Sequence, residues 1–229
     1  MSPSTPEYWR QVYDEEPRPG WDLDGPSPVL AELLEAAAAR GIALGGEIAV
    51  PGCGFGHDAA ELARRGFQVT AFDFAPPAIE GARKRYGDAV DWRLEDWFTT
   101  QEGPFDLIFD HTCFVAMEPA RRADYMDVCA DRLKPSGLWL AVLFDDTGGR
   151  PGPPFQIPMD EARSLAEAHF DVLHLQRATQ SHPRRAGREF LVIGRKKQAG
   201  ISHVGLKNQP GTQRDRGGST RYRGSLSPW

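Results

Sequence analysis

The sequence lacks several features that would define other classes of protein. No run of about 18 apolar residues occurs in its 229 residues, which excludes a membrane-spanning helix. The first residues, MSPSTP, have neither a basic region nor an apolar core, so no secretory signal is expected. The number of cysteines is odd, and none of them forms a CxxC pair: Cys53, Cys113 and Cys129. This pattern argues against a disulfide framework or a zinc site. We therefore expect a cytoplasmic protein with no bound metal and no membrane association.

The net charge of -5 is divided unevenly along the chain. Residues 195–229 carry eight Lys and Arg against one acid, whereas residues 1–194 carry 19 basic and 31 acidic groups. Such an acidic body argues against nucleic acid as a ligand, because phosphate binding requires basic side chains. Residues 198–229 are basic, rich in Gly and Ser and without hydrophobic periodicity, which predicts a disordered tail. This tail is either a solvated appendage or a segment that binds an acidic partner.

Short apolar strands alternate with helical segments along most of the chain, which predicts βαβ units and a mostly parallel sheet covered on both faces. Ser27 and Pro28 are expected to cap and begin the first of these helices. The predicted helices are 27–41, 56–65, 77–86, 121–133 and 160–168. The predicted strands are 47–51, 67–73, 89–94, 105–110 and 138–144, and 170–177 and 189–195 form a closing antiparallel pair.

A glycine-rich loop follows the first strand and leads into a helix. Gly52, Gly54 and Gly56 occur at every second position. Glycine lets the backbone pass close to a ligand, and this turn is where open α/β sheets bind nucleotides. A dinucleotide site requires GxGxxG, but His57 stands where its third glycine would be. The GxGxG pattern favours S-adenosylmethionine (SAM), which has no phosphate, and an NAD-dependent oxidoreductase remains the alternative.

Two acidic positions follow the next strands. Asp73 ends the second strand, where a carboxylate accepts hydrogen bonds from ribose hydroxyls. This role suits NAD as well as SAM, and the alternative is that Asp73 only caps the next helix. After the third strand, Asp96 and Trp97 could bind the adenine amino group and stack on its ring.

Several motifs in order resemble the thiopurine S-methyltransferase superfamily, most of all its halide and thiol (thiocyanate) methyltransferase branch. The similarity covers about residues 8–194. It rests on residues 8–13 (YWRQVY) with 20–22 (GWD), 50–54 (VPGCG), 105–110 (FDLIFD) with 116–122 (AMEPARR), 133–137 (LKPSG) and 152–155 (GPPF). The basic tail lies outside it.

This resemblance implies an α/β, Rossmann-like SAM-dependent methyltransferase fold, with a mostly parallel seven-stranded sheet containing one antiparallel strand. Residues 1–26 would be an aromatic lid segment, 27–197 the methyltransferase domain and 198–229 the tail. The alternative for Trp9 and Tyr13 is plain core packing. The residues implied to bind SAM are Trp9, Tyr13, Trp21, Gly52, Cys53, Gly54, Asp73, Phe74, Asp96, Trp97, Asp110 and His111.

The implied acceptor site departs from the family at several positions. Phe144 and Phe155 stand where close members have tyrosines, so the site lacks those hydroxyls. His111 also replaces a tyrosine, and could act as a catalytic base, as a cation near an anionic acceptor, or as a neutral hydrogen-bonded group.

A thiol or halide needs little more than alignment for in-line attack on the methyl group. We therefore expect a monomeric enzyme acting on a small soft nucleophile. A larger thiol, a thiopurine or a metalloid as acceptor, and a SAM-binding protein without activity, are the alternatives.

Overall fold

The computed structural model describes residues 2, 3, 5–16 and 18–198. All but the first residue of the predicted tail therefore lies outside the described residues. The strands are β1 (Glu47–Pro51), β2 (Gln68–Asp73), β3 (Asp91–Leu94), β4 (Phe105–His111), β5 (Leu133–Phe144), β6 (Phe170–Arg177) and β7 (Glu189–Lys196). The α-helices are α1 (Pro6–Glu15), α2 (Pro28–Ala38), α3 (His57–Arg64), α4 (Pro76–Tyr86), α5 (Cys113–Ala116), α6 (Arg122–Asp131) and α7 (Met159–Glu167). Two short 3₁₀ helices are η1 (Pro119–Arg121) and η2 (Pro183–Arg185).

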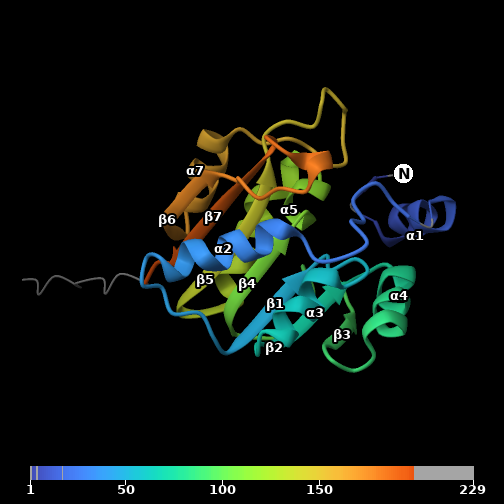
Figure 1. Ribbon diagram of the computed structural model, residues 1–229, viewed down its shortest axis with the longest axis horizontal. Coiled ribbons are helices and arrows are strands. Elements are labelled where there is room, and N and C mark those ends of the chain that lie inside the picture. The colour runs from blue at the N-terminus through green and yellow to red at the C-terminus, as the bar shows by residue number, and fades with distance from the viewer. Residues whose placement is uncertain (1, 4, 17, 199–229) are drawn as a thin grey trace, which may run out of the picture. The chain divides into compact units, whose positions relative to one another are not determined.

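The seven strands form one sheet in the order β3-β2-β1-β4-β5-β7-β6 (Figure 1). β1 pairs in parallel with both β2 and β4, and β5 continues the parallel part beyond β4. β7 runs antiparallel to both of its neighbours, β5 and β6. The order reverses between β1 and β4, so the chain crosses there from one half of the sheet to the other. This arrangement confirms the predicted fold, including its single antiparallel strand.

Apolar side chains cover both faces of the sheet. In β4, Leu107 and Phe109 belong to one core cluster and Ile108 to the other, because successive strand residues point to opposite faces. The first cluster includes residues of α2, α3 and α4, and α2 and α3 lie in front of the sheet in Figure 1. The second includes residues of α5, α6 and α7, with Trp139 and Tyr125 among its largest buried side chains. Helices on both faces leave the strand ends free to carry a site.

The start of α2 differs from the expectation in one respect. Ser27 occupies the N-cap position with extended backbone, but its hydroxyl makes no capping hydrogen bond. The Ser27 backbone N–H instead donates to Oδ1 of Asp58 on α3 at 2.7 Å. The predicted cap is therefore wrong in its chemistry, since this residue is fixed by a neighbouring helix.

The N-terminal helix α1 packs against α4 rather than in the sheet's two main clusters. Figure 1 shows α1 beside α4. Within the described part of the chain, no helix is both long and apolar enough to cross a membrane.

Candidate active site

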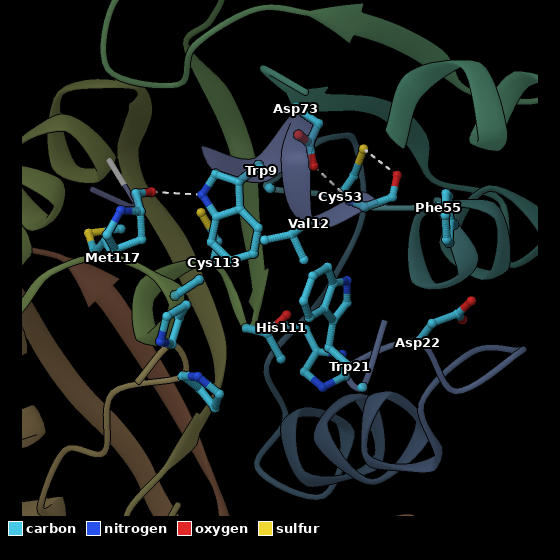
Figure 2. Close-up of a pocket in the computed structure, with 18 of the residues that line it drawn as sticks. Trp9, Val12, Trp21, Asp22, Cys53, Phe55, Asp73, His111, Cys113 and Met117 are labelled. Carbon is cyan, nitrogen blue, oxygen red and sulfur yellow. Dashed lines mark hydrogen bonds between the residues drawn. The ribbon is translucent and has the colours of Figure 1, made fainter. Parts of the chain in front are cut away.

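One cavity of about 520 Å³ lies where the loops after β1, β2, β3 and β4 meet the N-terminal segment. This is the edge where open α/β sheets bind ligands, and the volume lies within the usual range for small-molecule sites. The residues predicted from sequence that line it are Trp9, Tyr13, Trp21, Gly52, Cys53, Gly54, Asp73, Phe74, Asp96, Trp97, His111 and Phe144. In Figure 2 the labelled side chains of Trp9, Trp21, Asp73 and His111 surround the same space.

Asp110 and Phe155 are the two predicted site residues that do not line this cavity. The Asp110 carboxylate is fully buried and accepts a hydrogen bond from the Tyr125 hydroxyl at 2.6 Å and from the Phe114 N–H at 3.2 Å. Burial raises the pKa of Asp110 to about 6. The Phe155 N–H donates to the carbonyl oxygen of Val115 at 2.6 Å. Both residues thus hold together the elements around the cavity.

The glycines of the loop after β1 serve different purposes. Gly52 and Gly54 both have positive φ, at 57° and 55°. A Cβ on Gly52 would lie 2.8 Å from Sγ of Cys113, so this glycine is required by packing. A Cβ on Gly54 would instead face the tips of Tyr13 and Trp21, at 3.4 Å from the Tyr13 hydroxyl. Gly54 therefore lets the loop backbone lie close to the aromatic N-terminal segment.

Asp73 is positioned by the backbone around it. One carboxylate oxygen accepts from the Gly54 N–H and the other from the Ala75 N–H, both at 2.9 Å. Burial raises the pKa of Asp73 to about 6, and the two N–H donors oppose that rise. The carboxylate thus joins the glycine loop to the start of α4 while lining the cavity.

Aromatic rings from the N-terminal segment form one connected cluster over the cavity. Trp9 and Tyr13 come from α1, and Trp21 from the loop that follows. The Trp21 ring contacts both edge to face, with centroids 5.3 Å and 5.6 Å apart. Tyr13 also contacts Phe55 of the glycine loop at 5.1 Å. These contacts show that Trp9 and Tyr13 pack together and line the cavity as well, so core packing alone does not describe them.

Trp97 differs from the N-terminal aromatics because its ring lies mainly in the core. It is 4% exposed, and its ring centroid is 5.2 Å from that of Phe72. The neighbouring Phe98 is more exposed and carries the Arg121 guanidinium 3.8 Å from its centroid. Both residues line the cavity with Asp96.

His111, at the end of β4, has both ring nitrogens in short contacts. Nδ1 lies 2.6 Å from Oδ2 of Asp58, and Nε2 lies 2.7 Å from Nη1 of Arg185. A guanidinium only donates, so Nε2 accepts here and the neutral ring carries its proton on Nδ1, toward Asp58. These contacts are those of a neutral, hydrogen-bonded imidazole.

The charges around His111 oppose one another. Burial lowers the pKa of His111, but the Asp58 and Glu189 carboxylates outweigh it and hold that pKa above its ordinary value. Glu189 is fully buried, and its Oε1 lies 3.3 Å from Arg185 and 3.7 Å from His111. Protonation of Nε2 would break the bond with Arg185, because both groups would then be donors.

The loop at η2 and the start of α3 hold the segment that carries Trp21. Nη2 of Arg185 donates to the Trp21 carbonyl oxygen at 2.6 Å, and Arg184 donates to the Asp22 carbonyl oxygen at 2.8 Å. The Asp22 carboxylate lies 2.9 Å from Nε2 of His57. Nδ1 of this histidine lies 2.6 Å from the hydroxyl of Tyr86, so both of its ring nitrogens are also engaged.

Sequence reasoning missed the residues of this network: Asp22, His57, Asp58, Arg184, Arg185 and Glu189. His57 and Asp58 are adjacent in the sequence, but their partners lie 29 to 53 residues away, and Arg185 lies 164 residues from Trp21. No local spacing reports such contacts.

The two cysteines in the cavity wall are poorly suited to act as nucleophiles. Burial raises the pKa of both Cys53 and Cys113 well above that of a free thiol. Both thiols therefore stay protonated near neutral pH. Among the described residues, no group of three or more His, Cys, Asp or Glu side chains could hold a metal ion.

Comparison with solved structures agrees with this arrangement. The N-methyltransferase NodS from Bradyrhizobium japonicum WM9, in complex with S-adenosyl-L-homocysteine, matches with a TM-score of 0.67 at 18% identity, over 82% of this chain and 98% of that chain. The 1,6-didemethyltoxoflavin-N1-methyltransferase of Burkholderia thailandensis matches with a TM-score of 0.65 at 21% identity, over 85% of this chain and 91% of that chain. The fold is that of the SAM-dependent methyltransferases.

Comparison with curated proteins gives the family. Residues 4–198 match the thiopurine S-methyltransferase (TPMT) family. Probable thiol methyltransferase 2 of Arabidopsis thaliana is 30% identical over 215 residues, which are 90% of this chain and 91% of that protein. Thiocyanate methyltransferase 1 of Arabidopsis thaliana is 29% identical over 190 residues, which are 80% of this chain and 82% of that protein. The chain belongs to the TPMT family and is a SAM-dependent methyltransferase.

Proposed function

We propose that this enzyme transfers the methyl group of SAM to a small soft nucleophile: a thiol, sulfide, thiocyanate or a halide. The observation that carries the proposal is the state of the two histidines in the cavity wall. His57 and His111 each have both ring nitrogens in contacts with other side chains. Neither has a nitrogen free to take a proton from an acceptor. An acceptor that arrives already ionised fits this wall best.

Thiols and halides meet that requirement without help. A simple thiol has a pKa near 8.5, so a few per cent is thiolate at neutral pH, and a halide carries no proton. The names of the thiol and thiocyanate methyltransferases of Arabidopsis thaliana support the same class of acceptor. His111 then acts as a positioning residue, because it connects Asp58 to Arg185 and does not transfer a proton.

We assign the cofactor contacts to side chains of the cavity wall. SAM supplies an electrophilic methyl group on a sulfonium cation. Asp73 offers a carboxylate for the ribose hydroxyls, and Asp96 one for the adenine amino group. The faces of Trp9 and Trp21 attract a cation by about 0.5–2 kcal/mol. Residues 1–26 thus serve as a lid that covers the cofactor and excludes water.

The acceptor would lie on the other side of the cavity, near the end of β5. Phe144 lines the wall there, whereas Phe155 lies outside the cavity lining. The Phe144 ring is apolar and suits a soft, weakly hydrated nucleophile such as a thiolate. A small-molecule acceptor, a monomeric state and a cytoplasmic location belong to the same proposal.

The purified protein incubated with SAM and one acceptor at a time tests this proposal. Sulfide, methanethiol, thiocyanate and iodide form volatile methylated products that headspace gas chromatography detects. We expect product from at least one of them and none without enzyme. SAM binding without turnover of any of the four would refute the small-nucleophile assignment, and turnover of a thiopurine alone would move it to a larger acceptor.

A further inference from the structure

The charged side chains of the cavity wall are separated by sign along the sequence. Its carboxylates come mainly from the first half of the chain: Glu16, Asp22, Asp58, Asp73, Glu95 and Asp96, with Asp146 as the exception. Its arginines all come from the second half: Arg121, Arg150, Arg184, Arg185 and Arg188. The cofactor's sulfonium cation suits the acidic part, and the basic part suits a ligand of the opposite charge.

The sheet order keeps Asp73 apart from Arg150 and Arg188. Asp73 ends β2, whereas Arg150 and Arg188 flank the end of β5. Asp145 follows Phe144, and its N–H donates to the carbonyl oxygen of Arg188 at 3.2 Å. The Thr147 hydroxyl donates to the carbonyl oxygen of Arg150, also at 3.2 Å. β1 and β4 separate β2 from β5, which sets their ends about 14 Å apart at the usual strand spacing.

Most carboxylates near these two arginines are already engaged. Asp145 pairs with Arg177 at 2.6 Å, and Oδ1 of Asp146 accepts from the Gly148 N–H at 2.6 Å. Within residues 5–16 and 18–198, neither Arg150 nor Arg188 makes an ion pair with a carboxylate. Arg188 donates to the carbonyl oxygen of Arg184, which leaves its charge unbalanced. Arg185 differs, because buried Glu189 balances it.

We propose that Arg150 and Arg188 form a subsite for an anionic group, such as a carboxylate, carried by the thiol acceptor. The inference rests on the proposed methyl transfer and narrows its substrate class to small thiols with a second, negatively charged end. The thiolate would attack from beside Phe144 while the carboxylate binds the two guanidinium groups. Guanidinium and carboxylate match in geometry as well as in charge.

Three thiols of similar size separate binding of the far end from the reactivity of the thiol. They are 3-mercaptopropionate, 2-mercaptoethanol and cysteamine, whose far ends are anionic, neutral and cationic. Values of kcat/KM are expressed per thiolate, measured by its ultraviolet absorbance. The variants are Arg150→Gln, Arg188→Gln and the double variant. Arg163→Gln is the matched control. It removes the same charge, but Arg163 pairs with Glu167 on α7 and lies outside the cavity.

We expect the wild-type enzyme to prefer 3-mercaptopropionate to 2-mercaptoethanol by about tenfold or more, with cysteamine weakest. The Arg150 and Arg188 variants should lose that preference through a raised KM, while their turnover of 2-mercaptoethanol and their affinity for SAM stay within about twofold of wild type. Arg163→Gln should keep the preference.

Two results would overturn the subsite while leaving the proposed function intact. One is equal efficiency of the three thiols in the wild-type enzyme. The other is a weaker affinity for SAM in the Arg150 or Arg188 variants, measured by calorimetry, because the arginines would then hold the cofactor's own carboxylate. Failure of every thiol, sulfide, thiocyanate and iodide as acceptors would instead refute the proposed function together with this inference.

Discussion

Arg185 donates a hydrogen bond of 2.6 Å from Nη2 to the carbonyl oxygen of Trp21, 164 residues earlier in the chain. The other terminal nitrogen of the same guanidinium lies 2.7 Å from Nε2 of His111 at the end of β4. One buried cation therefore connects the aromatic N-terminal segment to the strand end in the middle of the sheet. This contact helps to hold the segment over the cavity, together with those of Arg184 and His57 to Asp22.

Removing Arg185 alone should be costly. Arg185→Met leaves the Glu189 carboxylate, which is fully buried, without its cationic partner. We expect a loss of about 3–5 kcal/mol in the free energy of unfolding, measured by urea denaturation. The double variant Arg185→Met with Glu189→Leu removes both charges and should recover most of that loss. A double variant as unstable as the single one would contradict the role given to this pair.

Replacing Asp73 should weaken cofactor binding. Asp73→Ala removes a carboxylate that would accept charge-assisted hydrogen bonds from the ribose, so the affinity for SAM should fall about 10- to 100-fold by calorimetry. Asp73→Asn is the matched control for shape, because its amide oxygen can still accept from one of the two N–H groups. Unchanged affinity in Asp73→Ala would show that the ribose binds elsewhere.

The buried Asp110 predicts a specific dependence of stability on pH. Its pKa is raised by burial from 3.8 to about 6, so the native state binds more protons than the unfolded chain between these values. The contribution of Asp110 to stability is therefore full below about pH 4 and falls as pH rises through 6, by at most about 1.4 kcal/mol per pH unit.

Asp110→Asn isolates that contribution, because an amide does not titrate in this range. Between pH 4.5 and 7.5, the unfolding free energy of wild type should fall relative to that of the variant. Urea titrations at fixed ionic strength measure both values. A difference that is constant with pH would show that the carboxyl ionises at its ordinary value in the fold, and one that grows in favour of wild type would place its pKa below that value.

The family match ends at residue 198, which predicts the effect of a truncation. A chain that ends at Gln198 should bind SAM and turn over acceptor within about twofold of the full chain, because the residues proposed for both sites precede this point. The comparison uses equal concentrations of folded protein, checked by circular dichroism. Loss of turnover in the shortened chain would place residues 199–229 in the active enzyme.

The sheet could be predicted closely because each strand carries its own signal. β1 begins and ends where the predicted strand 47–51 does, and β6 and β7 form the expected antiparallel pair. β5 was predicted too short, since it begins at Leu133 and includes Ser136 at a φ of 63°. A Lys-Pro-Ser-Gly stretch is a break by its composition, and in the fold it is an irregularity between two pairs with β4, Phe105 with Leu133 and Leu107 with Leu138.

The site was predictable to the extent that its residues follow strands in the sequence. Gly54, Asp73 and His111 each end or follow a strand, and the parallel sheet brings such positions to one edge. The environment of His111 was not predictable, because Asp58, Arg185 and Glu189 come from three separate elements and reveal their pairing only in the fold. Asp110 differs from its neighbour because alternation in β4 points it into the core.

The most direct measurement of the central claim uses SAM deuterated on its transferable methyl group. The purified enzyme is given this SAM with methanethiol or 3-mercaptopropionate, and the product is examined by mass spectrometry. The account predicts a methyl thioether that retains all three deuterium atoms, formed with an equal amount of S-adenosyl-L-homocysteine. An enzyme that binds the labelled SAM but forms no labelled product with any soft nucleophile would contradict it.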